Sequence, residues 1–475
     1  MSFEVIGNPN IIEMEYAVRG PIPQRAAELR KQGRRTVACN IGNPQALGQG
    51  PISYYRQVLS LLEDPARIEH ERALKRLIGE RREEIDWIPE EVLAVAERLL
   101  AGIGGSLGAY SESNGPLFIR EAVARFIDRR DDVATTGAPA ADPECIFLTN
   151  GASEAVRHLL EILIARPTDG IMIPIPQYPL YSAGIRKCGG VQVNYYPDEE
   201  GGWTLRRAAL EESLEHARRD GTEVKGLVVI NPGNPTGSIL PEESVHEVID
   251  FAENHGLVLI ADEVYQENVY GAPFVSFARA LGDRRVPLCS LHSVSKGFYG
   301  ECGHRGGYVE LRNPPRVRGA GGAGVALTEL LYKQASVSLC PNTVGQALTY
   351  LMVSPPEAGS APYELFAEQR RQILADLQAK AEMIRGAFRE MRGVECFGRL
   401  GALYLFPRLG GLPEGTTDFD YCMALLEATG LCTVNGAGFG QKRGTQHLRI
   451  AFLPPRELLE EVLPAWIRFH NEYVG

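Results

Sequence analysis

The stretch Leu227-Val-Val-Ile-Asn-Pro-Gly-Asn-Pro-Thr-Gly237 places a short apolar run directly before a turn of proline and glycine. A helical pattern follows and ends before a glycine, and its apolar positions, spaced as one helix face requires, are Val245, Val248, Ile249 and Ala252. Residues 257–261 form the next apolar run, which is again strand-sized. Strand, helix and strand in this order, without polar alternation in the strands, predict a parallel sheet that helices cover on both faces.

The same alternation continues on both sides of this segment. Further strands are expected at residues 145–149, 170–174 and 286–291. Asn150-Gly-Ala-Ser153 is expected to turn the chain from the first of these strands into a helix, because the apolar residues that follow repeat with a helical period. We therefore predict an α/β fold whose large domain holds a mostly parallel sheet sandwiched by helices.

We expect three parts along the chain. Residues 1–100 are expected to form an N-terminal arm and part of a small domain, residues 101–345 the large domain, and residues 346–475 a C-terminal small α+β domain. A Pro-rich stretch precedes a long charged helix at about residues 363–391, and domain boundaries often fall in such segments. The Arg/Glu-rich stretch from Arg67 to Glu84 predicts a helix in the first part.

Composition excludes several classes of protein. The 475 residues carry a net charge of −11 without a sustained basic stripe, so we expect no nucleic-acid partner. No apolar run approaches the roughly 20 residues that span a bilayer, so we expect no membrane association. Nine dispersed cysteines without a C-x-x-C pair, and an N-terminus without a leader pattern, favour reduced thiols, no metal site and a cytoplasmic location.

Polar residues follow three of the predicted strands, at the edge where ligands of open α/β sheets bind. These segments are Asn231 to Gly237, Asp262 to Tyr265, and His292 to Lys296. A lysine that is desolvated at such a strand end can act as an amine nucleophile and form a Schiff base with an aldehyde. Taken alone, Lys296 is more simply interpreted as a solvated surface lysine, as most lysines are.

Asp262 ends a predicted buried strand, where a carboxylate needs a cationic partner to remain ionised. The protonated pyridine nitrogen of pyridoxal phosphate is such a partner. Tyr265 can then donate a hydrogen bond to the phenolic oxygen of the same cofactor. For an isolated Asp-x-x-Tyr pattern, an aspartate that caps the next segment is the alternative.

Gly151, Ala152 and Ser153 open a helix directly after a strand. Free backbone N–H groups and the helix dipole make such a helix start an anion site suited to a phosphate. Ser293 and Arg305 are candidates to close the same site from the other side, the arginine through a bidentate pair. The alternative is a glycine that only makes the turn.

Gly319-Ala-Gly-Gly-Ala-Gly324 matches the dinucleotide-binding pattern G-x-G-x-x-G. That pattern binds a nucleotide only between a strand and a helix, and residues 312–318 before it contain two prolines and three arginines. We therefore interpret the segment as a flexible loop.

In their joint order these motifs resemble the class I/II aminotransferases of fold type I, which depend on pyridoxal phosphate. The order is Gly151-Ala-Ser153, Pro176-Gln-Tyr-Pro-Leu-Tyr181, the Asn-Pro-Gly-Asn-Pro-Thr-Gly turn, Asp-x-x-Tyr, Ser-x-Ser-Lys, Arg305 and Arg449. Similarity to the alanine aminotransferase subfamily extends over nearly the whole chain. It includes Val18-Arg-Gly-Pro-Ile22, Asn40-Ile-Gly-Asn-Pro44, Gly105-Ser-Leu-Gly-Ala-Tyr-Ser111, Gly300-Glu-Cys-Gly-His-Arg-Gly-Gly-Tyr308 and Gly438-Phe-Gly-Gln441.

The resemblance implies roles for individual residues. Lys296 would form the Schiff base with pyridoxal phosphate and move the proton at the substrate α-carbon, Asp262 would bind the pyridine nitrogen, and Tyr265 the phenolic oxygen. Further cofactor contacts would come from Ala152, Ser153, Tyr178, Asn234, Ser293 and Arg305, with Tyr110 reaching the phosphate from the neighbouring subunit of a homodimer. The substrate carboxylate would be held by Gly42 and Arg449.

The resemblance thus implies a transaminase that interconverts L-alanine and 2-oxoglutarate with pyruvate and L-glutamate by a ping-pong mechanism. A glutamate:glyoxylate aminotransferase of the same subfamily is the first alternative. A non-catalytic regulator that binds pyridoxal phosphate is a remote one, because residues 1–100 supply no convincing DNA-binding helix-turn-helix. A degenerate relative without activity disagrees with the intact set of Lys296, Asp262, Tyr265, Arg305 and Arg449.

Overall fold

The computed structural model describes residues 7–14, 20–78, 88–319 and 322–475. Its central feature is a seven-stranded sheet with strand order β2-β8-β7-β6-β5-β3-β4. β8 runs antiparallel to both of its neighbours, and the other pairs are parallel. The strands are β2 (Ile146–Thr149), β3 (Asp169–Pro174), β4 (Val191–Tyr195), β5 (Glu223–Ile230), β6 (Val258–Asp262), β7 (Leu288–Ser293) and β8 (Gly307–Arg312). The prediction of a mostly parallel sheet is confirmed.

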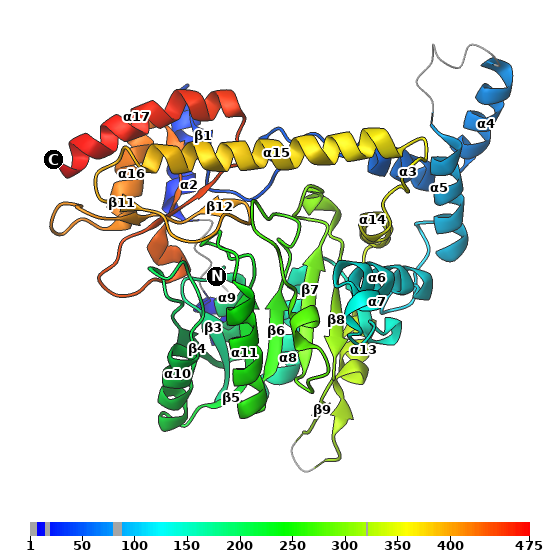
Figure 1. Ribbon diagram of the computed structural model, residues 1–475, viewed down its shortest axis with the longest axis horizontal. Coiled ribbons are helices and arrows are strands. Elements are labelled where there is room, and N and C mark those ends of the chain that lie inside the picture. Colours follow the sequence, from blue (N-terminus) through cyan, green and yellow to red (C-terminus); the bar gives the residue numbers. More distant parts are fainter. Residues whose placement is uncertain (1–6, 15–19, 79–87, 320–321) are drawn as a thin grey trace, which may run out of the picture.

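Helices cover both faces of this sheet (Figure 1). Because alternate side chains of a strand point to opposite faces, Ile171 and Ile173 pack in one hydrophobic cluster and Met172 in another. The helices of the first cluster include α8 (Ala152–Leu163) and α9 (Leu180–Cys188), and those of the second are α10 (Arg207–Arg219), α11 (Glu242–His255) and α12 (Phe277–Leu281). The helix expected after residue 237 is α11, and Gly256 caps it at φ 65°.

A third hydrophobic cluster packs against the β2 and β8 edge of the sheet. Ile146, Leu148 and Tyr308 supply the strand side chains of this cluster. The helices around it are α3 (Ser53–Glu63), α4 (Ala66–Ile78), α5 (Glu90–Gly102), α6 (Leu117–Arg130), α14 (Thr343–Val353) and the N-terminal part of α15 (Tyr363–Phe388). α7 (Val133–Thr136) and α13 (Leu327–Val337) lie at the same side of the molecule in Figure 1.

A smaller α+β unit lies at the other end of α15, which runs across the top of the molecule in Figure 1. Its main sheet has the order β12-β16-β15 and is antiparallel, and α16 and α17 pack beside it. The N-terminal segment joins the unit, because β1 pairs in parallel with β14. Its elements are α2 (Pro21–Lys31), β1 (Val37–Ala38), β11 (Val394–Glu395), β12 (Tyr404–Leu405), β13 (Arg408–Leu409), α16 (Asp418–Thr429), β14 (Leu431–Cys432), β15 (Val434–Asn435), β16 (Leu448–Ala451) and α17 (Arg456–Val474). The exact domain boundaries stay a prediction.

Gly319 and residues 322–324, the described part of the glycine segment, lie between two strands that pair as an antiparallel hairpin, β9 (Arg316–Val317) and β10 (Val325–Ala326). The hairpin lies at the bottom of Figure 1, at the opposite end of the molecule from α15. The buried strand β8 ends at Arg312, before the two prolines. The strand, turn and helix of a dinucleotide site are therefore not formed here.

Three expectations from the sequence fall partly outside the described residues. They are the motif at residues 18–22, the helix expected at residues 67–84, whose described part is α4, and the centre of the glycine segment. All nine cysteines are described, and all are free thiols. Within the described ranges, no helix combines the length and the apolar character needed to cross a bilayer.

Candidate active site

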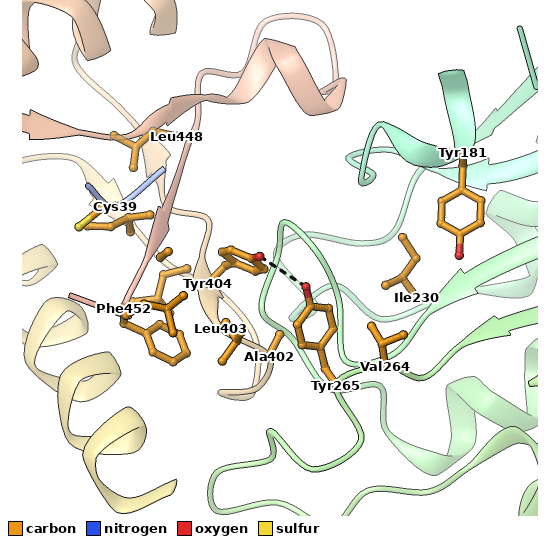
Figure 2. Packing of buried hydrophobic residues seen from close by; sticks show 14 of the residues in the cluster. Cys39, Tyr181, Ile230, Val264, Tyr265, Ala402, Leu403, Tyr404, Leu448 and Phe452 are labelled. Carbon is orange, nitrogen blue, oxygen red and sulfur yellow. Dashed lines mark hydrogen bonds between the residues drawn. The ribbon is translucent and has the colours of Figure 1, made fainter. Parts of the chain in front are cut away.

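A cavity of about 640 Å³ opens at the carboxyl ends of β5, β6 and β7, between the central sheet and the smaller α+β unit. The pairing register places Ile230 opposite Asp262 and Asp262 opposite Leu291, so the three strand ends come level. We call the segments that follow them, residues 231–237, 262–265 and 293–296, the sheet rim. The opposing rim consists of residues 40–42 with Tyr404 and Arg449. Figure 2 shows Tyr265 and Tyr404 facing each other from the two rims.

Almost every site residue predicted from the sequence lines this cavity. Those that do are Gly42, Ala152, Ser153, Tyr178, Asn234, Asp262, Tyr265, Ser293, Lys296, Arg305 and Arg449. Tyr110 does not, because its side chain is 78% exposed on the surface of the same chain. Its assignment to a neighbouring subunit therefore stays a prediction.

Asp262 is a buried carboxylate that pairs with no cationic side chain of the described residues. The Tyr181 hydroxyl donates to its Oδ2 at 2.7 Å and the Val264 backbone N–H to its Oδ1 at 3.4 Å, but it forms no ion pair within the described chain. Burial raises the pKa of Asp262, against these hydrogen bonds and the charge of Lys296. A cationic ring nitrogen in the cavity would supply the missing charge.

Arg305 is the reverse case, a cation without a carboxylate partner among the described residues. Its Nη2 donates to the Asn150 carbonyl at 2.8 Å and to Ser153 Oγ at 3.0 Å, and its Nη1 donates to the Cys302 carbonyl at 3.1 Å. No carboxylate of the described residues pairs with this guanidinium. It lies beside the first turn of α8, so a guanidinium, a hydroxyl and free helix N–H groups converge on one anion-sized space.

Gly151 allows that approach. Its φ of 76° belongs to the left-handed region, and a Cβ built on it would lie 2.7 Å from Arg305 Nη2. The neighbouring hydroxyls of Ser293 and Ser295 lie 3.0 Å apart at the same side of the cavity. The glycine expected to make this turn therefore also makes room for the guanidinium.

Lys296 projects into the cavity from the end of the sheet rim. Its Nζ donates to the Gly42 carbonyl of the opposing rim at 3.1 Å and lies 5.6 Å from the centroid of the Tyr265 ring. Burial acts to lower the pKa of this amine, but Tyr404, Cys302 and Tyr178 outweigh burial and leave the pKa of Lys296 raised. The amine is thus held across the cavity by a single backbone oxygen that a ligand can replace.

Arg449 is 1% exposed and also has no carboxylate partner among the described residues. Its Nη2 donates to the Asn40 carbonyl at 2.7 Å and its Nη1 to Asn234 Oδ1 at 3.1 Å, while its Nε has no partner. Leaving a buried guanidinium without a counter-ion is costly. A carboxylate that enters the cavity can pair with its planar fork.

These unpaired groups fit pyridoxal phosphate and a substrate carboxylate. A buried carboxylate faces a cavity that also holds an amine, an anion cradle and a second, separate guanidinium. Asn234 Nδ2 donates to the Tyr265 hydroxyl at 3.4 Å, so both residues proposed for the phenolic oxygen lie together. The pyridine nitrogen, the phosphate and the aldehyde of the cofactor each find a group of the chemistry they require.

A family model for aminotransferase class I and II matches residues 80–465, and the chain belongs to this family. Human alanine aminotransferase 1 is 42% identical over 98% of this chain and 94% of its own length. Glutamate–glyoxylate aminotransferase 1 of Arabidopsis thaliana is 41% identical over 98% of this chain and 95% of its own. The solved structure of an alanine aminotransferase from Pyrococcus furiosus matches the fold with a TM-score of 0.76 at 23% identity, over 98% of this chain and 100% of the other.

The chain is therefore an aminotransferase of fold type I. Its cofactor is pyridoxal phosphate, and its substrates are amino acids and 2-oxo acids. The expected fold, enzyme class and cofactor are confirmed, and the alternative of a non-catalytic regulator is not supported.

Sequence reasoning assigned no role to several residues of the cavity. They are Pro23, Gln24 and Ala27 of α2, with Asn40, Ile41, Ser295, Cys302 and Tyr404. Tyr181, which bonds Asp262, stood in a quoted motif without a role. Nothing in the local pattern marks Tyr404, because β12 contains two residues and shows no period.

Proposed function

We propose that this aminotransferase interconverts L-alanine and 2-oxoglutarate with pyruvate and L-glutamate. The transamination chemistry rests on one observation: Arg449 is buried in the cavity that holds the Lys296 amine, and no carboxylate in the described ranges pairs with it. The choice of alanine rests on relatives named alanine aminotransferase that match 98% of the chain at 42% identity.

Three residues carry the proposed reaction. Arg449 holds the α-carboxylate of the substrate, and the Gly42 segment supports that carboxylate from the opposing rim. Lys296 would move a proton from the substrate α-carbon to the carbon that is the aldehyde carbon of the free cofactor, and in the second half of the reaction it would move a proton in the opposite direction. When bound, pyridoxal phosphate supplies an electron-withdrawing ring that stabilises negative charge on that carbon.

The remaining predicted residues hold the cofactor. Asp262 binds the pyridine nitrogen and is held in place by Tyr181, while Tyr265 and Asn234 bind the phenolic oxygen. Tyr178 packs on the ring face. The phosphate is bound by Ala152, Ser153, Ser293 and Arg305, with Tyr110 of a second subunit. Because every substrate of the pair carries an α-carboxylate for Arg449, one site can serve both in turn, as a ping-pong mechanism requires.

A homodimer is part of the proposal. Tyr110 is 78% exposed, and Val337 and Leu339, at 83% and 53%, are exposed nearby. The Ser113 hydroxyl donates to the Leu339 carbonyl at 2.8 Å, which holds the two segments together. Exposed apolar residues gathered in this way are typical of a protein interface. Sedimentation of the holoenzyme should give the mass of two chains, and a monomer would contradict the shared site.

Glutamate:glyoxylate transamination is the second candidate. It is favoured by the 41% identity to the Arabidopsis protein of that name, which is similar to the identity with the alanine aminotransferases. A cytoplasmic location also stays a proposal, and two relatives are named as mitochondrial proteins.

The test mixes purified holoenzyme with L-alanine and follows the visible absorption of the cofactor. We expect alanine to change the spectrum, and pyruvate then to restore it. An unchanged spectrum would contradict the alanine assignment. Comparing pyruvate and glyoxylate as acceptors, with glutamate as the donor, separates the two candidates, because a strong preference for glyoxylate would select the second.

A further inference from the structure

Tyr404 lines the cavity and has no role in the reaction proposed above, although it lies against Tyr265, Arg449 and the Gly42 backbone. Its side chain is 2% exposed and comes from β12 of the smaller α+β unit. Its hydroxyl oxygen lies 3.5 Å from that of Tyr265, and the two rings meet edge to face with centroids 6.0 Å apart (Figure 2). Tyr404 is therefore a contact between the two rims.

The ring of Tyr404 lies against the guanidinium of Arg449. The Arg449 Cζ is 4.2 Å from the Tyr404 centroid and 4.6 Å from that of Phe439. No described carboxylate holds this guanidinium in place. A planar cation stacks favourably on aromatic rings, so the two rings orient the fork together with its hydrogen bonds to Asn40 and Asn234.

The hydroxyl of Tyr404 packs on the backbone that receives Lys296. A Cβ added to Gly42 would lie 1.8 Å from the Tyr404 oxygen and 3.4 Å from Lys296 Nζ, so both atoms lie beside Gly42. Lys296 Nζ in turn donates to the Gly42 carbonyl at 3.1 Å. The phenol oxygen and the amine thus share one glycine, which has no side chain to separate them.

Electrostatics agree with this placement. Burial acts to raise the pKa of Tyr404, yet the positive charges of Lys296 and Arg449 and the hydrogen bond with Tyr265 leave it lowered. Conversely, Tyr404 is the largest contributor that raises the pKa of Lys296. The other titratable groups that act on Lys296 or lie around it in the cavity are Tyr178, Asp262, Tyr265, Cys302, Arg305 and Arg449.

We propose that Tyr404 is a positioning residue with two separable tasks. Its ring helps to aim the Arg449 fork at the substrate carboxylate, and its hydroxyl keeps the Lys296 nitrogen protonated and oriented on the Gly42 side of the cavity before the substrate binds. The proposal rests on the roles proposed above for Lys296 and Arg449. Tyr404 belongs to the smaller unit, whereas Lys296 follows a strand of the central sheet. The position of the amine therefore also depends on how closely the two rims approach each other.

Tyr404→Phe tests the hydroxyl and keeps the ring. We expect the pH midpoint of the visible absorption band of the holoenzyme, measured without substrate, to fall by about one pH unit, because an oxygen that favours the protonated nitrogen is removed. We expect kcat to fall about tenfold while KM for alanine stays within about twofold. The same midpoint and an unchanged kcat would overturn the hydroxyl task.

Tyr404→Leu tests the ring, with Tyr404→Met as a second ringless variant. Both should raise KM for alanine about tenfold beyond Tyr404→Phe, because the guanidinium loses a stacking partner. Equal KM values for the ringless variants and Tyr404→Phe would overturn the ring task. Circular dichroism and cofactor content, matched to the wild type, identify the variants that are folded and loaded.

Tyr195→Phe is the matched control. Its hydroxyl is also buried and donates to the Val228 carbonyl at 2.8 Å, but it does not line the cavity. This variant should lose stability without moving the spectral midpoint, kcat or KM, and a shift as large as that of Tyr404→Phe would contradict the specific role. The spectral midpoint is measured without substrate. A wild-type enzyme that does not react with alanine would therefore contradict the proposed function, but the test of the Tyr404 hydroxyl would still be valid.

Discussion

The two rims of the cavity are built in different ways. The sheet rim takes its residues from three segments at the ends of β5, β6 and β7, which run parallel in one sheet, so their side chains meet when these strands pair in register. The opposing rim takes Gly42 from an N-terminal segment, Tyr404 from β12 and Arg449 from β16, and no single motif contains them. The sheet rim is thus encoded by short contiguous motifs, whereas the opposing rim is assembled from distant segments when the smaller unit packs against the sheet.

We assign the proton transfer at the substrate α-carbon to the sheet rim. Lys296→Ala removes the amine that lines the cavity and crosses to Gly42, so we expect kcat to fall by about 10⁴-fold. Single-turnover spectroscopy with alanine measures this loss. Lys225→Ala, which removes a half-buried lysine of β5 outside the cavity, should keep the wild-type rate, and a full-rate spectral change in Lys296→Ala would refute the assignment.

Substrate binding is assigned to the opposing rim. Arg449→Lys keeps the charge but replaces the planar fork and the stacking on Tyr404 and Phe439, so we expect kcat/KM for alanine and for glutamate to fall about 10²-fold. The cofactor absorption without substrate should stay close to that of the wild type. A loss for only one of the two amino acids would show that Arg449 does not hold the carboxylate they share.

The affinity for pyridoxal phosphate tests the proposed phosphate site at Gly151 and Arg305. Gly151→Ala introduces a left-handed alanine whose Cβ would press on Arg305 Nη2, so we expect pyridoxal phosphate to bind about tenfold more weakly. Titration of the apoenzyme, followed by fluorescence, measures the affinity. Gly137→Ala is the matched control, because its φ is +69° but no atom lies within 4 Å of the added Cβ. Equal losses in both variants would show that strain alone, without contact to Arg305, explains the effect.

The smallest effect is expected at Glu263, a buried residue of the sheet rim that does not line the cavity and accepts a hydrogen bond from the Phe277 N–H. Burial raises the pKa of Glu263 to about 7, although Arg130 and the Phe277 N–H favour the charged form. The folded state then holds this proton more tightly than the unfolded state, so the free energy of unfolding falls as the pH rises from about 4.5 to about 7.

Glu263→Gln removes this titration. Its stability relative to the wild type should therefore rise over the same pH range, by about 1 kcal/mol or more. Urea unfolding of the apoenzyme at several pH values measures the difference. A constant difference between pH 5 and 8 would show that the carboxyl titrates normally, whereas kcat should change little in either case because Glu263 does not line the cavity.

The two rims also differ in how far they could be predicted. Asp262 directly follows an apolar run, and Tyr265 and Lys296 lie three residues beyond the ends of their strands. Ligands of open α/β sheets bind at such strand ends, so the polar residues there could be found from the sequence. Tyr181 lies 81 positions from Asp262 and bonds it only because α9 packs on the sheet. Strands β4 and β8 were also not predicted, since β4 alternates at the sheet edge and β8 runs against its neighbours.

The sequence by itself determined the α/β class, the strand ends that carry the polar residues, and the family, because apolar periodicity and contiguous motifs survive without coordinates. Only the tertiary structure decided that Arg449, Arg305 and Asp262 lack counter-ions among the described residues, and that Tyr404 contacts Arg449 and the Gly42 backbone beside Lys296. The physical reason is that an unpaired charge is a property of everything packed around it, whereas a motif is a property of its neighbours along the chain.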